Sequence, residues 1–186
     1  MARNIEIKAR IASVDALLPR VRALAGGAAP ELIVQHDCFY ACANGRLKLR
    51  RFADGSGELI HYLRPDAPGP KMSDYRRVPV PDPQRLHEAL EGALGAVARV
   101  RKRRWLLRVG ATRIHLDRVE SLGDFLELEV VLRDEQSAAE GVATAHALRS
   151  ALGVPEDDCI AGAYADLLAP NTGEDRRVKG DSTPAA

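Results

Sequence analysis

The chain has 186 residues, of which 46% are hydrophobic and 28% are charged, and its formal net charge is +1. This length and composition predict one globular domain with a substantial core and exclude a largely disordered chain. The near-neutral charge argues against a generally basic nucleic-acid binder, so we expect no nucleic-acid partner.

Cysteine use and hydropathy predict the compartment. Cys38, Cys42 and Cys159 are an odd number of cysteines without paired spacing, and we interpret them as free thiols in a reducing compartment. No apolar run approaches the length of a membrane span, and charges begin at Arg3, which does not fit a signal peptide. A cytoplasmic protein without a membrane partner is therefore expected, and an oligomer is left open.

The first predicted strand, residues 4–8, shows the pattern that recurs along the chain. Asn4, Glu6 and Lys8 point to one side, and Ile5 and Ile7 point to the other. This period of two is typical of a strand with one polar and one apolar face.

A helix is predicted next. Ser13 is a capping residue, Leu17, Val21 and Leu24 form an apolar stripe, and a pair of glycines ends the pattern. Alternation then predicts seven more strands, over residues 35–42, 46–52, 58–64, 71–80, 97–109, 112–119 and 125–132. Further helices are expected at 83–94, 137–152 and 158–168, and residues 170–186 are interpreted as a disordered tail.

Eight strands joined mostly by short turns predict an α+β fold: one eight-stranded antiparallel closed β-barrel with covering helices, over residues 1–169. The helices would cover the apolar outer faces of the strands. The polar faces would then surround a charged channel.

Such an interior needs a ligand that matches its charges, because buried charges are costly unless they are paired, solvated or bound. The predicted interior carboxylates are Glu6, Glu127 and Glu129, with Asp117 and Glu58 as further candidates. The predicted interior cations are Lys8, Lys48, Arg50, Arg64, Lys71, Lys102, Arg104 and Arg113. Carboxylates suit Mg²⁺ or Mn²⁺, and Lys and Arg suit phosphate oxygens, so the pattern favours a metal–polyphosphate complex.

Each motif taken alone also fits a solvated sheet face. On the strand at 97–109, Arg101 and Arg103 fall on the face opposite Lys102 and are expected outside the channel. His115 is interpreted as a channel or core histidine rather than a metal ligand. Tyr62 and Trp105 are interpreted as packing residues.

The sequence resembles the CYTH superfamily, the triphosphate tunnel metalloenzymes, which include class IV adenylate cyclases and thiamine triphosphatases. Asn4-Ile5-Glu6-Ile7-Lys8 resembles the Glu-x-Glu-x-Lys signature that opens the family. Further matches follow in family order, at residues 47–50, 58–64 with Lys71, 102–104, Asp117 with 125–129, and 164–167.

The resemblance implies a tunnel that binds a triphosphate with a divalent metal. It implies metal ligation by Glu6, Glu127 and Glu129, phosphate binding by the interior cations, and catalytic roles for Glu6, Lys8 and Asp117. Asn4 departs from the signature, which has Glu at this position. Its amide oxygen brings no charge to the metal.

Three functions follow from this resemblance. The leading one is a class IV adenylate cyclase-like reaction, in which ATP gives cyclic AMP and pyrophosphate. The second is a triphosphatase acting on thiamine triphosphate, tripolyphosphate or a nucleotide. The third is a non-catalytic module that binds nucleotide or polyphosphate.

Overall fold

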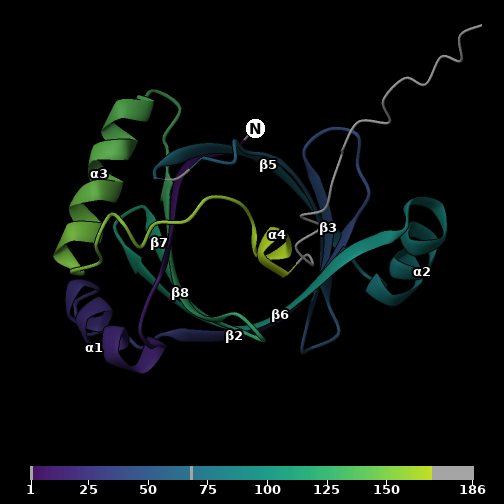
Figure 1. Cartoon of the computed structure of the whole chain (residues 1–186), viewed down its shortest axis with the longest axis horizontal. Helices are drawn as coiled ribbons and strands as arrows, with labels where there is room; N and C mark the ends of the chain where they lie inside the picture. Colours follow the sequence, from purple (N-terminus) through teal and green to yellow (C-terminus); the bar gives the residue numbers. More distant parts are fainter. Residues whose placement is uncertain (1, 68, 169–186) are drawn as a thin grey trace, which may run out of the picture.

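The structure, a computed structural model, describes residues 2–67 and 69–168. Within them, eight antiparallel strands close into a barrel, as predicted (Figure 1), and their order around it is β1-β5-β4-β3-β2-β6-β7-β8. The strands are β1 (Ala2–Arg10), β2 (Glu31–Tyr40), β3 (Arg46–Phe52), β4 (Gly57–Leu63), β5 (Lys71–Val80), β6 (Ala96–Val109), β7 (Thr112–Val119) and β8 (Gly123–Val131). The predicted tail at 170–186 lies outside the described residues.

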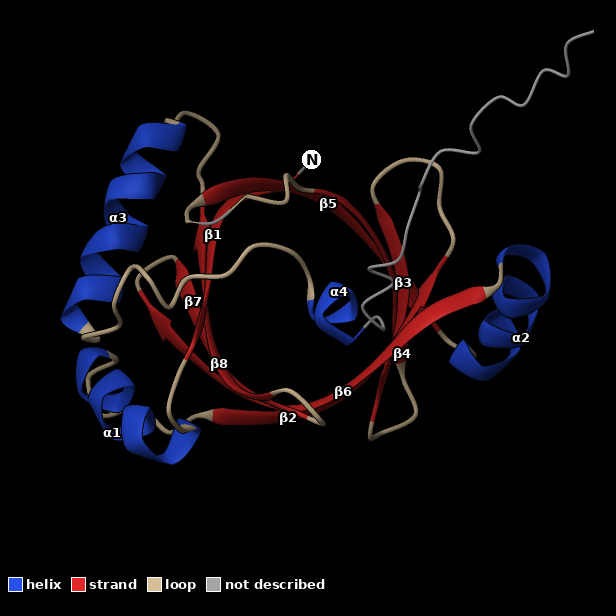
Figure 2. Ribbon diagram, in the orientation of Figure 1, coloured by secondary structure: helices blue, strands red, loops and turns tan. Residues whose placement is uncertain are grey.

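Two helices cover the apolar side of β1, β7 and β8 (Figure 2). They are α1 (Val14–Leu24), which Ser13 caps, and α3 (Ala138–Ala151), which begins with a capping box formed by Ser137 and Glu140. Ile5, Ile114 and Leu128 from the strands pack against the helices in one cluster. A fully buried side chain of this size contributes about 1.5–3 kcal/mol to folding, so this layer is a major source of stability.

One glycine permits the close approach of α3. A Cβ at Gly141 would lie 2.6 Å from Leu132 Cδ2 and 2.7 Å from Ile5 Cγ1. The helix therefore contacts the barrel through bare backbone at this point.

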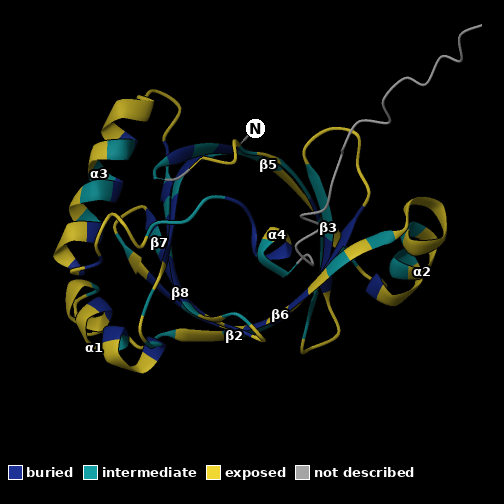
Figure 3. Ribbon diagram, in the orientation of Figure 1, coloured by how far each residue is buried: buried dark blue, intermediate teal, exposed yellow. Residues whose placement is uncertain are grey.

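The remaining helices lie at other places on the barrel. α2 (Pro83–Leu94) packs Leu86 and Leu90 on the outer side of β2 and β3. α4 (Tyr164–Leu168) lies across one end of the barrel, inside the ring of strands when the molecule is viewed as in Figure 1. Outward sides of the helices are exposed, whereas most strand residues are buried or half-buried (Figure 3). None of the described helices is both long enough and apolar enough to span a bilayer.

The structure corrects one predicted core residue and two predicted boundaries. Leu24 is 38% exposed instead of facing the core, because α1 buries Val14, Leu17 and Val21. β2 begins at Glu31, four residues before the prediction, and ends at Tyr40. The last helix is five residues long, because residues 158–160 run along β1 instead: Ile160 N donates to the carbonyl of Lys8 at 2.9 Å.

Candidate functional site

The barrel interior is a cavity of about 320 Å³ with a large excess of positive charge. Among the described residues, nine Lys and Arg side chains and five Asp and Glu side chains line it. The cations are Lys8, Lys48, Arg50, Arg64, Arg77, Lys102, Arg104, Arg108 and Arg113, and the acids are Glu6, Asp37, Glu58, Glu127 and Glu129. The cavity therefore suits a ligand with several negative charges.

One buried carboxylate, Asp37 on β2, holds two of these cations. Arg50 on β3 is its register partner and donates through Nε and Nη2, each at 2.8 Å. Lys48 Nζ donates to the same carboxylate at 2.8 Å. Burial alone would raise the pKa of Asp37, but the attraction of Arg50 and Lys48 outweighs it and holds the pKa well below the ordinary value. Burial, reinforced by Arg50, lowers the pKa of Lys48 to about 7.

Asp117 on β7 forms a second unit of the same kind with two cations of β6. Arg104 is again the register partner and donates to both carboxylate oxygens at 2.6 Å, and Lys102 Nζ donates at 2.9 Å. Tyr164 from α4 adds a hydroxyl donor at 3.1 Å. Asp117 is 0% exposed and does not line the cavity, so its place is behind the cations it orients.

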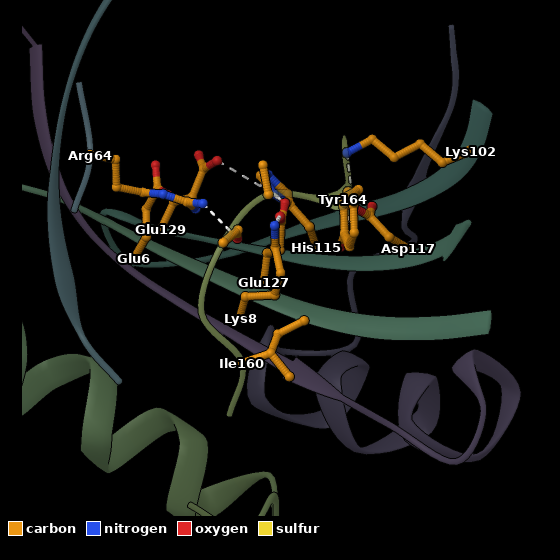
Figure 4. Close-up of polar contacts among 12 residues, drawn as sticks. Glu6, Lys8, Arg64, Lys102, His115, Asp117, Glu127, Glu129, Ile160 and Tyr164 are labelled. Carbon is orange, nitrogen blue, oxygen red and sulfur yellow. Dashed lines mark hydrogen bonds and ion pairs between the residues drawn. The ribbon is translucent and has the colours of Figure 1, made fainter. Parts of the chain in front are cut away.

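A chain of ion pairs runs along β1, β8 and β7 (Figure 4). Lys8 Nζ lies 2.9 Å from Glu127 Oε1, and Arg104 contacts Glu127 Oε2. Arg113 Nε donates to Glu129 Oε2 at 2.7 Å. Burial would raise the pKa of Glu127, but attraction to Lys8 and Arg104 lowers it well below its ordinary value. These carboxylates are therefore charged at neutral pH.

Residues 158–165 close one end of the cavity, and their carbonyls accept hydrogen bonds from two of the side chains predicted to bind phosphate. Arg64 Nη2 donates to the carbonyl of Gly162 at 2.6 Å, while its Nη1 donates to Glu6 at 3.0 Å. Lys71 Nζ donates to the carbonyls of Ala67 at 2.6 Å and Ile160 at 3.3 Å. Lys71 thus lies outside the cavity lining, where it holds the closing segment.

Tyr164 is the side chain by which this segment enters the charged interior (Figure 4). The ammonium of Lys8 lies 3.9 Å and that of Lys102 5.0 Å from the centre of its ring. Cation–π contacts of this kind stabilise buried ammonium groups. Tyr164 therefore fixes two cations as well as Asp117.

One group of side chains has the composition of a metal site. His115, Glu127 and Glu129 each offer a ligand atom, and these atoms lie within 4.8 Å of one another. Glu6, the third predicted ligand, is the register partner of Glu129 and lines the same cavity. The residues present fit a divalent ion, because carboxylate oxygens are its preferred ligands.

Unsatisfied buried atoms mark the same cavity. Four buried side-chain atoms of the described residues have no hydrogen-bond partner, and all four belong to lining residues: Asn4 Oδ1, Gln35 Oε1, Arg64 Nε and His115 Nδ1. Such atoms are rare in folded proteins, and their concentration here indicates a place for a ligand.

The sequence prediction found most of the lining and missed part of it. Arg101 and Arg103 are exposed and Lys102 and Arg104 are buried, as the predicted register requires. The sequence pattern puts Asp37 in the predicted strand at 35–42 and Tyr164 in the predicted helix at 158–168, and it gives no role to either residue. Asp37 is recognisable in hindsight by its place on the strand that pairs with the Lys48-x-Arg50 motif.

Comparison with known proteins supports the family resemblance. The family model described as the CYTH domain matches residues 2–164. The PH1012 protein from Pyrococcus horikoshii OT3 superposes with a TM-score of 0.78 at 24% identity, over 88% of this chain and 98% of that chain. A Vibrio parahaemolyticus protein provisionally assigned as an adenylate cyclase gives a TM-score of 0.73 at 22% identity, over 89% and 97%.

A third similar structure is HpAC1 from Hippeastrum, an assigned adenylyl cyclase described as having a dominant triphosphatase activity. It gives a TM-score of 0.61 at 14% identity, over 88% of this chain and 91% of that chain. No curated protein matches the sequence. At these identities the three structures establish a shared fold.

Proposed function

The chain belongs to the CYTH family, and we propose that it is a divalent-metal-dependent enzyme that converts ATP to cyclic AMP and pyrophosphate in the barrel interior. The observation that carries this proposal is the excess of nine cationic over five acidic side chains around one cavity. A nucleoside triphosphate and its metal ion supply the missing negative charge and the missing ligand together.

The two Asp-centred units bind the phosphates in this proposal. Each unit carries one Lys and one Arg against one Asp, and therefore a net charge of +1 when its lysine is protonated. Arg50 and Arg104 are held through two nitrogens each, so their orientation is fixed before the substrate arrives. Prearranged donors stabilise charge that develops on a leaving pyrophosphate without a reorganisation cost.

The carboxylates serve the metal and the nucleophile. Glu127 and Glu129, with Glu6 beside them, would hold the ion, which stabilises charge on the reacting phosphate. Glu6 takes the proton of the attacking 3′-hydroxyl at Oε1, the oxygen that Arg64 does not contact. Lys8 neutralises Glu127 and faces the same cavity.

The apolar part of the lining favours a substrate with an organic group. Phe39, Phe52, Ile60 and Tyr62 line the cavity beside the cations, and inorganic tripolyphosphate has no surface to pack against them. A nucleobase has such a surface, since aromatic side chains stack on bases.

Hydrolysis is the second candidate, and the Hippeastrum protein favours it. That protein shares this fold and is described as a dominant triphosphatase. In a triphosphatase, water would attack a terminal phosphorus in the same cationic cavity. The two reactions therefore differ in the nucleophile and in which phosphorus of the substrate lies beside it.

Product analysis tests the proposal. The wild-type protein is incubated with ATP, tripolyphosphate and thiamine triphosphate under Mg²⁺ or Mn²⁺, and the products are identified. Cyclic AMP supports the cyclase, orthophosphate supports the triphosphatase, and tight binding without turnover overturns both enzymatic readings.

The carboxylate variants sharpen this test. Glu127→Ala and Glu129→Ala should abolish metal-dependent turnover while circular dichroism shows a folded protein. Glu120→Ala is the matched control, because Glu120 is 64% exposed in a loose ion pair with Arg101. Unchanged turnover in both site variants would refute the metal assignment.

A further inference from the structure

His115 is buried beside the two carboxylates of β8, at ion-pair distance from both. It lies in the interior face of β7, directly across from Glu127 in the β7–β8 register. The side chain is 4% exposed, and its Nδ1 is a buried atom without a hydrogen-bond partner. Burying an imidazole nitrogen without a hydrogen-bond partner is costly, and a ligand bound at Nδ1 would remove this cost.

The distances around Nδ1 fit an ion better than a hydrogen bond. Nδ1 lies 3.6 Å from Glu127 Oε2 and 3.7 Å from Glu129 Oε1, and both separations exceed a normal hydrogen bond. Two atoms bonded to one ion at about 2.1 Å are separated by about 3.0 Å at a right angle and about 3.4 Å at a tetrahedral angle. A shift of a few tenths of an ångström would place all three atoms around one ion.

The neighbouring cations leave Glu129 Oε1 available, whereas an ion would share the oxygens of Glu127 with its cation partners. Both oxygens of Glu127 contact cations, Lys8 and Arg104. Glu129 is contacted by Arg113 at Oε2, so its Oε1 remains turned towards His115. Figure 4 shows His115 beside Glu127, with Glu129 further along, near Glu6 and Arg64.

We propose that His115 Nδ1 is a direct ligand of the divalent ion together with Glu127 and Glu129, and that this nitrogen makes the site prefer a first-row transition ion over Mg²⁺. The proposal deepens the proposed function and rests on it only in placing a divalent ion at these carboxylates. Imidazole suits transition ions, whereas Mg²⁺ prefers an all-oxygen shell and gives up its water reluctantly. For ligation, the imidazole proton resides on Nε2.

The isosteric variant His115→Asn isolates the effect of the nitrogen. The Asn Oδ1 occupies about the position of Nδ1, keeps the side chain neutral, and replaces nitrogen by oxygen. Mn²⁺ and Mg²⁺ binding to the wild type and to this variant is measured by isothermal titration calorimetry. We expect His115→Asn to weaken Mn²⁺ binding about tenfold or more and to change Mg²⁺ binding by less than about threefold.

A spectroscopic measurement reads the bond directly. Electron spin-echo modulation of bound Mn²⁺ should show coupling to a histidine ¹⁴N in the wild type, and the coupling should change on ¹⁵N-histidine labelling. It should be absent from His115→Asn and present in the control His36→Asn, because His36 is exposed on β2. If His115→Asn does not fold, the labelled wild type still decides.

Two outcomes would overturn the proposal: wild-type Mn²⁺ without histidine coupling, or equal losses of Mn²⁺ and Mg²⁺ affinity in His115→Asn. These outcomes leave the enzymatic proposal intact if the wild type still converts a triphosphate. Histidine coupling without turnover of any triphosphate would support this site and overturn the proposed reaction.

Discussion

Asp117→Asn distinguishes a positioning role for Asp117 from the catalytic role implied by sequence. In the structure its carboxylate accepts four hydrogen bonds, from Lys102, Tyr164 and two nitrogens of Arg104, at 2.6–3.1 Å. The Asn side chain has no charge, and its NH₂ group would face the hydrogen-bond donors that the carboxylate accepted from. Lys102 and Arg104 then remain buried without their main counter-charge.

The expected cost is large because the whole unit is buried. Removing one partner of a buried ion pair costs about 3–5 kcal/mol. For a chain of this size that corresponds to a fall in Tm of roughly 6–20 °C. The value should lie at the lower end, since Lys102 and Arg104 line a cavity and gain contact with water when Asp117 is neutral.

Thermal and urea unfolding with and without tripolyphosphate measure this cost. Tripolyphosphate should raise the Tm of Asp117→Asn more than that of the wild type, because phosphate oxygens replace the lost carboxylate as partners. The control Glu120→Gln, in an exposed ion pair, should change stability by less than about 0.5 kcal/mol.

The acid limb of the stability curve provides a second readout. Burial would raise the pKa of Asp117, but Arg104 and Lys102 hold it far below the ordinary value. The stabilisation is therefore complete above the unfolded pKa of about 3.9 and is lost as pH falls towards the folded pKa. Asp117→Asn should flatten this limb. Wild-type stability combined with a turnover loss of a thousandfold would refute the positioning role and restore the catalytic one.

Three further predictions concern the cavity. Arg104→Ala should weaken tripolyphosphate binding by tenfold or more, as judged from calorimetry, whereas Arg103→Ala on the exposed face of β6 should change it less than twofold; equal effects would contradict the barrel register. Asn4→Glu should lower the metal concentration for half-maximal activity, since Asn4 Oδ1 is buried without a partner and a carboxylate adds charge there; superimposable metal titrations would place Asn4 outside the metal shell. Burial lowers the pKa of Lys48 to about 7, and bound phosphate raises it again, so tripolyphosphate binding should take up a proton at pH 8 but not at pH 6. Calorimetry in buffers of different ionisation enthalpy measures this proton uptake. If Lys48→Met leaves the uptake unchanged, the proton binds to another group.

The barrel was predictable because its interior is polar and its outer face is apolar, the reverse of an ordinary protein core. Charged residues face inwards and aliphatic residues face the covering helices, so strict alternation marks nearly every strand. The prediction missed the start of β2, where Leu32 points outwards at 56% exposure, uncovered by any of the described helices, and a polar glutamate precedes it. A pattern based on burial cannot detect a strand whose outer face is open to water.

The site was predictable in its composition and not in its pairing. Strand periodicity places Lys48 and Arg50 inside, but their partner Asp37 comes from another strand, and no local pattern pairs it with them. Lys71 follows the same periodicity, but its ammonium donates to the carbonyls of Ala67 and Ile160, contacts that strand periodicity does not predict. Tyr164 reaches Asp117 across 47 residues of sequence, a contact that no local pattern predicts.

The repeated Asp-centred unit explains how one barrel interior can be both folded and ready for an anion. Nine bare cations around a single cavity would repel one another strongly, and the barrel would pay for this in stability. One Asp for each Lys–Arg pair reduces the repulsion among the four cations of the two units and still leaves a net charge of +1 in each unit when its lysine is protonated. Because each Asp is the register partner of its Arg, strand pairing itself sets the direction of the guanidinium. A bound triphosphate therefore meets cations whose geometry the β-sheet has already fixed, and its charge replaces only the part that the two carboxylates leave uncompensated.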